Sequence, residues 1–189
     1  MREPIINRTE IIVDKEILLR IVEQEDAELI FKTIDNERNY LKEWLPFVEE
    51  THDISYTKTF IDHAIAAESH DLTFTISYQN QFVGIIGLKD TDMGNQKTEI
   101  GYWISEKFQH KGIITLSCKS LINYAFDEIN IHRIQLKVAT NNLKSQAVAA
   151  RLGFIFEGIE RDGELHSSGF VDLKVYSLLK ENQSDVLHF

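Results

Sequence analysis

The spacing of hydrophobic residues changes several times along the first half of the chain. Apolar positions recur every three or four residues from Asp26 to Leu41, which predicts a helix. Pro46 then disfavours helix at the residue before it, and Ser55 is the expected N-cap of a second helix that reaches Ile65. Runs rich in β-branched and aromatic residues predict strands at 11–13, 17–22, 72–78, 82–88 and 98–104.

Helices and strands alternate after residue 104. The short turns between the central strands predict an antiparallel meander, whereas a strand–helix–strand connection requires at least one parallel pair. This combination predicts an α+β or mixed α/β fold. The expected helices cover 112–129 and 143–152, the second closed by Gly153 at C′, and the expected strands cover 134–138, 154–157 and 171–179.

The junction between the 98–104 strand and the 112–129 helix carries the first candidate chemistry. Free N–H groups at a helix start, together with the positive end of the helix dipole, favour an anion. Gly112 would let a ligand approach the backbone, and Thr115 could add a hydroxyl donor. Lys107, His110 and Lys111 gather positive charge there. From the loop alone, an anion site and a solvated helix cap are equally good interpretations.

Length and composition fit an ordinary globular domain. The 189 residues favour a single domain over 1–189, with a core over about 9–180 and short terminal extensions. Lys and Arg number 20 against 30 Asp and Glu, so the net charge is −10. Phosphate backbones require a basic field, and direct nucleic-acid binding is therefore not expected.

The remaining composition signals are mostly negative. Cys118 is the only cysteine, so it has no internal disulfide partner, and it falls on the apolar stripe of its helix. The 7 His form no cluster with metal-ligand spacing, so no metal is expected. The first ten residues do not read as a signal peptide, and the longest apolar stretch, 82–88, is too short to span a membrane. We therefore expect a cytoplasmic protein that does not bind membranes.

Several motifs, taken in order, resemble one enzyme family. The segment 109–114, Gln-His-Lys-Gly-Ile-Ile, resembles the Gln/Arg-x-x-Gly-x-Gly/Ala loop of the GCN5-related N-acetyltransferases (GNAT superfamily), with Ile114 departing from the final small residue. Trp44-Leu45-Pro46 is typical of the branch that acetylates the N-termini of ribosomal proteins. The resemblance runs from about Ile17 to Leu179 and is also carried by 99–103, 131–134, 142–145, 152–154 and 157–158.

The resemblance implies a mixed, mostly antiparallel sheet of about seven strands, flanked by helices, whose central parallel strands splay apart. Acetyl-CoA would be the cosubstrate, with its pantetheine arm between those strands. A backbone N–H of Trp103 or Ile104 would polarise the thioester carbonyl. Asn142 would touch the pantetheine or orient the next helix. The backbone that would hold the pyrophosphate runs through Gln109, His110, Lys111, Gly112, Ile113, Ile114 and Thr115.

Amine attack on a thioester needs a base for the ammonium proton and a donor for the leaving thiolate. Glu164, expected in a polar hairpin connection, resembles the base of this branch, and Glu99 is a second acid to consider. Ser145 resembles its thiolate donor and would also contact the coenzyme. Tyr176 matches a tyrosine acid of other branches, although a tyrosine in an alternating strand is usually a core residue.

The resemblance implies direct transfer to a primary amine, with the N-terminal α-amine of a protein, such as a ribosomal protein, as the favoured acceptor. A small amine (a polyamine, amino acid or antibiotic) is the alternative acceptor. A sensor that binds acetyl-CoA without turnover is the alternative function. Related enzymes often dimerise, so a homodimer also stays open.

Overall fold

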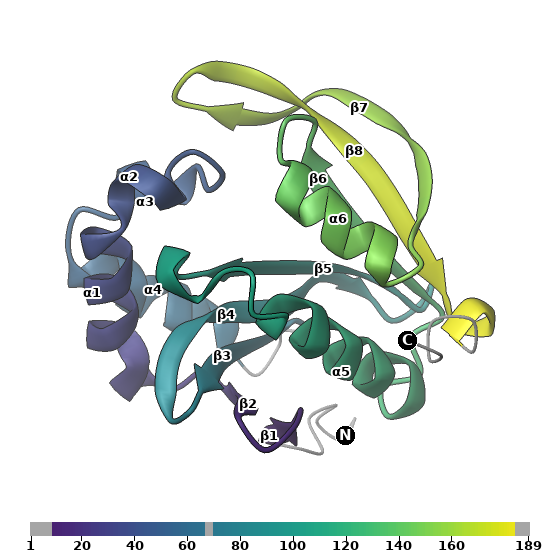
Figure 1. Cartoon of the computed structure of the whole chain (residues 1–189), viewed down its shortest axis with the longest axis horizontal. Helices are drawn as coiled ribbons and strands as arrows, with labels where there is room; N and C mark the ends of the chain where they lie inside the picture. Colours follow the sequence, from purple (N-terminus) through teal and green to yellow (C-terminus); the bar gives the residue numbers. More distant parts are fainter. Residues whose placement is uncertain (1–8, 67–69, 184–189) are drawn as a thin grey trace.

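The computed structural model describes residues 9–66 and 70–183. One eight-stranded sheet forms most of it, with strand order β1-β2-β3-β4-β5-β6-β8-β7 (Figure 1). The strands are β1 (Glu10–Ile12), β2 (Ile17–Ile21), β3 (Leu72–Tyr78), β4 (Gln81–Asp92), β5 (Lys97–Ile104), β6 (Arg133–Ala139), β7 (Ile155–His166) and β8 (Gly169–Leu179). Neighbouring strands are antiparallel except β5 and β6, which run parallel.

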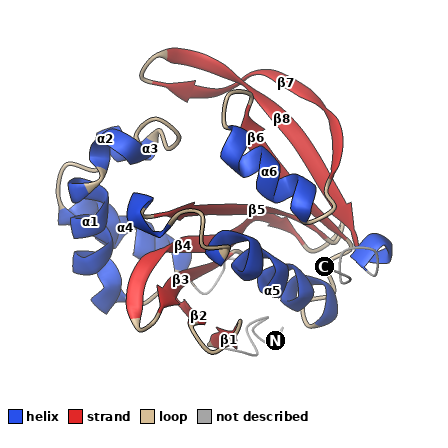
Figure 2. Cartoon of the chain, viewed as in Figure 1, coloured by secondary structure: helices blue, strands red, loops and turns tan. Residues whose placement is uncertain are grey.

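Helices lie on both faces of the sheet (Figure 2). Before β3 the chain forms η1 (Gln24–Asp26), α1 (Ala27–Asn36), α2 (Arg38–Leu41), α3 (Phe47–Glu50) and α4 (Ile54–Ala64). After β5 it forms η2 (Glu106–Phe108), α5 (Ile113–Asp127), α6 (Leu143–Arg151) and η3 (Lys180–Asn182). None of the helices in the described ranges is long and apolar enough to cross a membrane.

The α+β architecture and its meander match the sequence prediction, with three local corrections. The single helix expected over 26–41 is divided, because Glu37 between α1 and α2 leaves the helical region at φ −113°. Asp53, not Ser55, is the N-cap of α4: its carboxylate accepts the Ser55 N–H at 2.7 Å. The segment expected as 154–157 continues as the twelve-residue strand β7, which leaves Glu164 inside a strand.

Two apolar clusters hold the helices against the sheet. On one face, α5 and α6 pack on the central strands, with Phe74, Leu121 and Phe126 fully buried. On the other face, α1 and α4 pack on β4 through Ile30, Ile61 and Ile85. Gly153 ends α6 in the left-handed conformation, with φ 72°, as expected at C′. Helices therefore cover both faces of the part of the sheet that the N-terminal strands form.

The parallel pair β5–β6 is short. Only three residue pairs join these strands, from Lys97↔Arg133 to Glu99↔Gln135. Beyond them β5 stays with β4, while β6 stays with β8 over seven pairs. Figure 1 shows the two groups of strands meeting at one end and diverging toward the other. The predicted splay of the central parallel strands is thereby confirmed.

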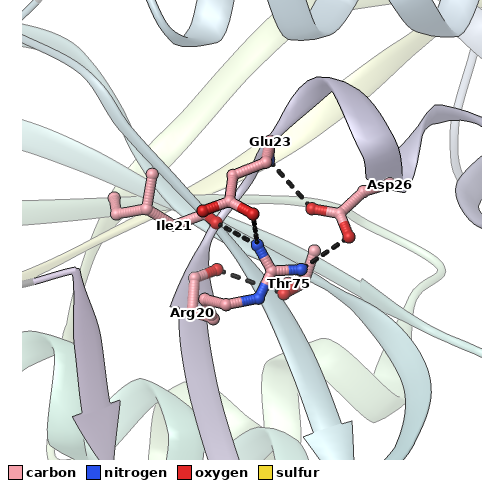
Figure 3. A network of polar contacts seen from close by, with 5 residues as sticks. All are labelled: Arg20, Ile21, Glu23, Asp26 and Thr75. Carbon is pink, nitrogen blue, oxygen red and sulfur yellow. Dashed lines mark hydrogen bonds and ion pairs between the residues drawn. The ribbon is translucent and has the colours of Figure 1, made fainter.

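A polar network fixes the point where β2 leads into the first helical region (Figure 3). Arg20 contacts Asp26 at 2.6 Å and Glu23 at 2.9 Å, and the other Asp26 oxygen accepts the Glu23 N–H at 2.8 Å. The Thr75 hydroxyl donates to the Arg20 carbonyl from β3. Because Asp26 is buried, removing the Arg20 guanidinium would leave its carboxylate without a compensating charge.

A second ion pair ties the far end of the sheet together and gives a prediction for stability. Both guanidinium nitrogens of Arg133 donate to Glu157, at 2.7 and 2.5 Å, and the Ser177 hydroxyl adds a bond at 2.8 Å. The Arg133 bonds lower the pKa of Glu157 from 4.5 to about 2. A depressed carboxyl pKa stabilises the fold above pH 4.5, and this contribution is lost as the pH falls toward 2.

We predict that Glu157→Gln lowers the free energy of unfolding by about 1 kcal/mol at pH 7, a value reduced for solvent screening of this partly exposed pair. The deficit should shrink to less than half at about pH 3, because the carboxyl of the unfolded wild-type chain, with its ordinary pKa of 4.5, is then protonated while the folded one is still mostly ionised. Urea unfolding from pH 3 to 7 measures it, with the exposed Glu49→Gln as the control. A deficit that stays constant over this range would contradict the prediction.

Candidate functional site: a cleft between the diverging strands

The divergence of β5 and β6 opens a cavity of about 1000 Å³. Residues 99–104 of β5 and 136–139 of β6 form its two sides. The first turns of α5 and α6 line it, as do Tyr40 and Leu41 of α2 and the loop residues Trp44 and Leu45. Glu164 of β7, Leu173 of β8 and the pair Lys89 and Asp90 of β4 also line it. The cavity therefore brings together segments from across the whole chain.

The start of α5 is built to accept an anion. Gly112 is the N-cap in the left-handed conformation, with φ 77°, and no side chain caps the helix. A Cβ at this position would meet nothing within 4 Å, so the backbone is open to a ligand. The helix pattern leaves the first-turn N–H groups of Ile113, Ile114 and Thr115 without backbone acceptors. All of these residues line the cavity.

Basic side chains surround this end of the cavity, although not all of those expected. His110, Lys111, Lys144 and Arg151 line it. Lys107 is absent from the lining; its ammonium lies 5.2 Å from the Phe108 ring centroid. The positive charge that the sequence placed at this loop is thus supplied partly by α6.

The side chain of Gln109, whose backbone was expected to serve the anion site, bonds to two other segments of the chain. Its amide donates to the Tyr40 hydroxyl of α2, and its carbonyl oxygen accepts from Lys144 at 2.8 Å. The Lys144 ammonium also lies 5.9 Å from the Tyr40 ring centroid. This bridge links α2 to α6, and only the Gln109 backbone is left to serve the anion site. Tyr40 and Lys144 lie 69 and 35 positions from Gln109 in the sequence, so no local pattern could predict these contacts.

Two backbone N–H groups, those of Trp103 and Ile104, were expected to face the thioester. The pairing of β5 with β4 leaves only that of Ile104 facing the gap beside β6. The Ser105 N–H donates to the Val83 carbonyl on β4, and Trp103 pairs with Ile85 in the same phase. Because successive N–H groups along a strand point to opposite sides, that of Ile104 points away from β4, toward the gap beside β6. The Trp103 indole instead packs against Phe82, 5.9 Å between centroids.

Gly84 makes this arrangement of β4 and β5 feasible, and sequence reasoning did not identify it. It pairs with Ile104, and an added Cβ would lie 2.1 Å from the Trp103 carbonyl oxygen. Any side chain would push the two strands apart where the Ile104 N–H is aimed. Gly84, one of two glycines in the 82–88 run, was the available signal, because a glycine inside a strand often marks a close backbone approach.

Ser145 lies in the first turn of α6 and lines the cavity. Asn142 is the N-cap of this helix: its side-chain oxygen accepts the Ser145 N–H at 3.1 Å. Of the two roles expected for Asn142, the structure therefore shows helix orientation. The Tyr102 hydroxyl is buried beside Ser145 without a well-aligned hydrogen bond. Burial raises the pKa of Tyr102, and the nearby serine hydroxyl offsets this slightly.

Glu164 reaches the cavity from strand β7, where it pairs with Val171. One of its carboxylate oxygens lies 2.7 Å from Nε2 of His166. Glu99, the other acid considered, also lines the cavity, but its carboxylate is buried and paired with Lys89 at 2.9 Å. Glu164 is therefore the more accessible of the two carboxylates.

The remaining catalytic candidate, Tyr176, lies away from the cavity. Tyr176 is not part of its lining; the ring sits on β8 against Phe156, 5.6 Å between centroids. Cys118 is buried on α5, as its place on the apolar stripe predicted, and burial raises the pKa of its thiol. The structure thus brings Ser145, Glu164 and the paired Glu99 to one cavity, and of the two acids Glu164 is the accessible one.

A splayed parallel pair with an uncapped helix start beside the gap defines a protein built to hold an extended, anionic coenzyme. The family model described as acetyltransferase (GNAT) domain matches residues 16–155. The chain belongs to this family and is an acetyl-CoA-dependent N-acetyltransferase.

Relatives with assigned names extend the comparison. YdaF of Bacillus subtilis (strain 168), whose provisional name is ribosomal N-acetyltransferase, is 38% identical over 171 residues, 89% of this chain and 93% of that protein. Ribosomal-protein-serine acetyltransferase of Escherichia coli (strain K12) is 26% identical, covering 90% and 97%. Spermidine N(1)-acetyltransferase of the same strain is 23% identical, covering 75% and 74%.

A solved structure shares the whole architecture. The microcin C7 self-immunity acetyltransferase MccE, in complex with acetyl-CoA and AMP, superposes with a TM-score of 0.86 at 27% identity. The match covers 94% of this chain and 99% of that one. The fold expected from the sequence motifs is therefore the fold observed.

Proposed function

We propose that this enzyme transfers the acetyl group of acetyl-CoA directly to the N-terminal α-amine of a protein, with a ribosomal protein as the leading acceptor. The observation that carries the proposal is the single cavity shared by the α5 start, Ser145 and Glu164. The named ribosomal-protein relatives support this acceptor class. A ribosomal acceptor would also place the reaction in the cytoplasm.

The coenzyme end of the cavity would be served mainly by backbone. The N–H groups from Gly112 to Thr115 would bind the pyrophosphate, with Lys111 and Lys144 adding charge. The Ile104 N–H, aimed into the gap between β5 and β6, would polarise the thioester carbonyl as negative charge develops on its oxygen. Asn142 would act by fixing α6, which carries Ser145.

Two side chains would handle the protons. Glu164 would take one proton from the acceptor ammonium, directly or through a water, leaving a neutral amine to attack the carbonyl carbon. Ser145 would donate its hydroxyl proton to the leaving thiolate as the carbon–sulfur bond breaks. The amine nitrogen would lose its second proton as the tetrahedral intermediate collapses, and this proton would restore the Ser145 hydroxyl. One net proton then stays on Glu164 and passes to solvent after the product leaves.

The acceptor end of the cavity carries the opposite charge from the coenzyme end. Glu99, Glu164 and Asp90 line it together with Lys89 and Lys137. Lys137 bonds Glu160 at 2.8 Å; this bond raises the pKa of Lys137, and Glu99 and Asp90 add to the shift. Four carboxylates thus face two ammonium groups. The remaining negative charge would attract an ammonium-bearing acceptor, and the net charge of −10 would favour a basic chain around it.

A polyamine acceptor is the second candidate, because the same excess of carboxylates suits a small molecule with several ammonium groups. The spermidine acetyltransferase relatives favour it. A direct comparison of acceptors separates the two.

The deciding experiment offers [¹⁴C]acetyl-CoA with two synthetic peptides, one starting with serine and one with alanine, each followed by a basic tail, and with spermidine. We expect acetylation of a peptide, loss of the signal when its N-terminus is blocked, and a rate that falls as salt screens the acidic surface. Faster transfer to spermidine would establish the polyamine function instead. Coenzyme binding without transfer to any of them would favour the sensor.

Glu164→Gln should lower kcat for the accepted amine by about 10²–10³ at pH 7, the usual contribution of a general base. The deficit should narrow above about pH 8, where a growing share of an α-amine is already neutral. Acetyl-CoA affinity, measured by calorimetry, should be unchanged. A variant with wild-type kcat across this pH range would exclude Glu164 as the base.

Ser145→Ala should slow transfer about tenfold or more while the coenzyme still binds, because a proton donor to the thiolate is lost. Tyr176→Phe is the matched control: it also removes one hydroxyl, but from a ring outside the cavity lining. The two variants are compared by thiol release under saturating substrates. Equal rates in wild type and Ser145→Ala, or a larger defect in Tyr176→Phe, would contradict the assignment.

A further inference from the structure

His166 is the one side chain recorded in contact with the Glu164 carboxylate among the described residues. The two residues are two positions apart on β7 and therefore project from the same side of the strand. Their surroundings differ: 6% of the His166 side chain is exposed, against 40% of the Glu164 side chain. A nearly buried ring thus holds a half-exposed carboxylate at the edge of the cavity.

The contact between His166 and Glu164 fixes which ring nitrogen carries a proton and which carboxylate oxygen is already bonded. An ionised carboxylate only accepts hydrogen bonds, so His166 Nε2 must carry the proton that fills the 2.7 Å contact with Oε2 of Glu164. The second oxygen, Oε1, has no recorded partner among the described residues and belongs to a side chain that lines the cavity. One oxygen is held by the protein, and the other is left for the acceptor.

Position matters here because a free glutamate side chain populates several rotamers. Fixing a long side chain costs conformational free energy, and a displacement of about 1 Å from the reacting group can lower a rate 10²-fold. The His166 ring is already immobilised by burial, and its register opposite Gly169 fixes it at the end of the β7–β8 hairpin. A hydrogen bond from such a ring restricts the carboxylate at little further entropic cost.

We propose that His166 is a positioning residue that orients Glu164 toward the acceptor amine, an inference that rests on the proposed role of Glu164 as base. The proton leaves the ammonium nitrogen and bonds to Oε1 of Glu164, while His166 keeps its own Nε2 proton throughout. The imidazole does not exchange protons with the substrate. Its contribution is made entirely through the carboxylate.

The kinetic test compares two substitutions of His166 with the peptide that the enzyme acetylates best. His166→Phe keeps a ring without a donor and should lower kcat about 10- to 100-fold, with the KM for acetyl-CoA unchanged. His166→Gln places an amide N–H at a similar reach and should recover most of the lost rate. The double variant His166→Phe/Glu164→Gln should lose no more kcat than Glu164→Gln alone, because His166 acts only through the Glu164 carboxylate.

The possible failures are distinguishable. Full activity of Glu164→Gln would remove the base itself. A slow Glu164→Gln with a wild-type His166→Phe, or additive losses in the double variant, would overturn the positioning role and leave the base in place. Equal defects in His166→Phe and His166→Gln would also overturn it, since the donor would then be irrelevant.

A spectroscopic measurement needs neither an acceptor nor a folded His166→Phe. ¹⁵N-labelled wild-type protein should show the His166 ring with its proton on Nε2, identified by comparison with His166→Gln. In Glu164→Ala that resonance should shift and its N–H proton should exchange faster with solvent. A His166 ring with its proton on Nδ1, or one unaffected by Glu164→Ala, would overturn the proposal.

Discussion

The early end of pairing between β5 and β6 is the constraint on which the rest of the molecule depends. A parallel sheet would ordinarily continue its hydrogen bonds along both strands, yet here only three residue pairs join them. Every N–H and C=O that would have been paired beyond Glu99 must find another partner, because buried backbone groups rarely stay unbonded. An extended, amide-containing ligand between the strands meets this requirement. The binding site therefore arises where β5 and β6 stop pairing with each other.

Other interactions keep the two halves of the sheet in place once they diverge. The buried clusters of α5 and α6 extend over both halves, and the Arg133–Glu157 pair joins β6 to β7 at the closed end. At the open end, Gln109 links Tyr40 to Lys144 across the cavity. These contacts join the two halves of the sheet at both ends of the gap. Such joins suit a direct transfer reaction, since the amine and thioester must meet at close range.

The chain carries a net negative charge, yet the coenzyme end of its cavity is suited to an anion. Local structure explains how both hold. The α5 start supplies N–H groups whose partial charge does not depend on composition, and Lys111, Lys144 and Arg151 stand beside it. The acceptor end instead shares the acidic character of the whole molecule. Under the proposed function, a single cavity would bind a polyanion at one end and an ammonium at the other.

Sequence periodicity was sufficient to predict the α+β fold, and the resemblance to the family implied the splay. The fold depends on local signals, namely alternation along strands and short turns, whereas the anion site at the start of α5 stays a prediction. The errors all involve distant contacts or local competition. Glu37 interrupts an apolar pattern that reads as one helix, and pairing with β8 extends β7 well beyond the segment expected as a strand.

Glu164 shows how such an error bears on function. A polar, charged stretch before the last strand resembles a loop, because charged residues dominate both exposed hairpin connections and edge strands. Pairing of Glu164 with Val171 and of His166 with Gly169 turns that stretch into a strand. A carboxylate on a loop would sample many positions, whereas one on a paired strand, with a buried neighbour two residues away, has a fixed origin and direction. Strand pairing, which no single residue in 160–166 specifies, is therefore what makes this acid a credible base.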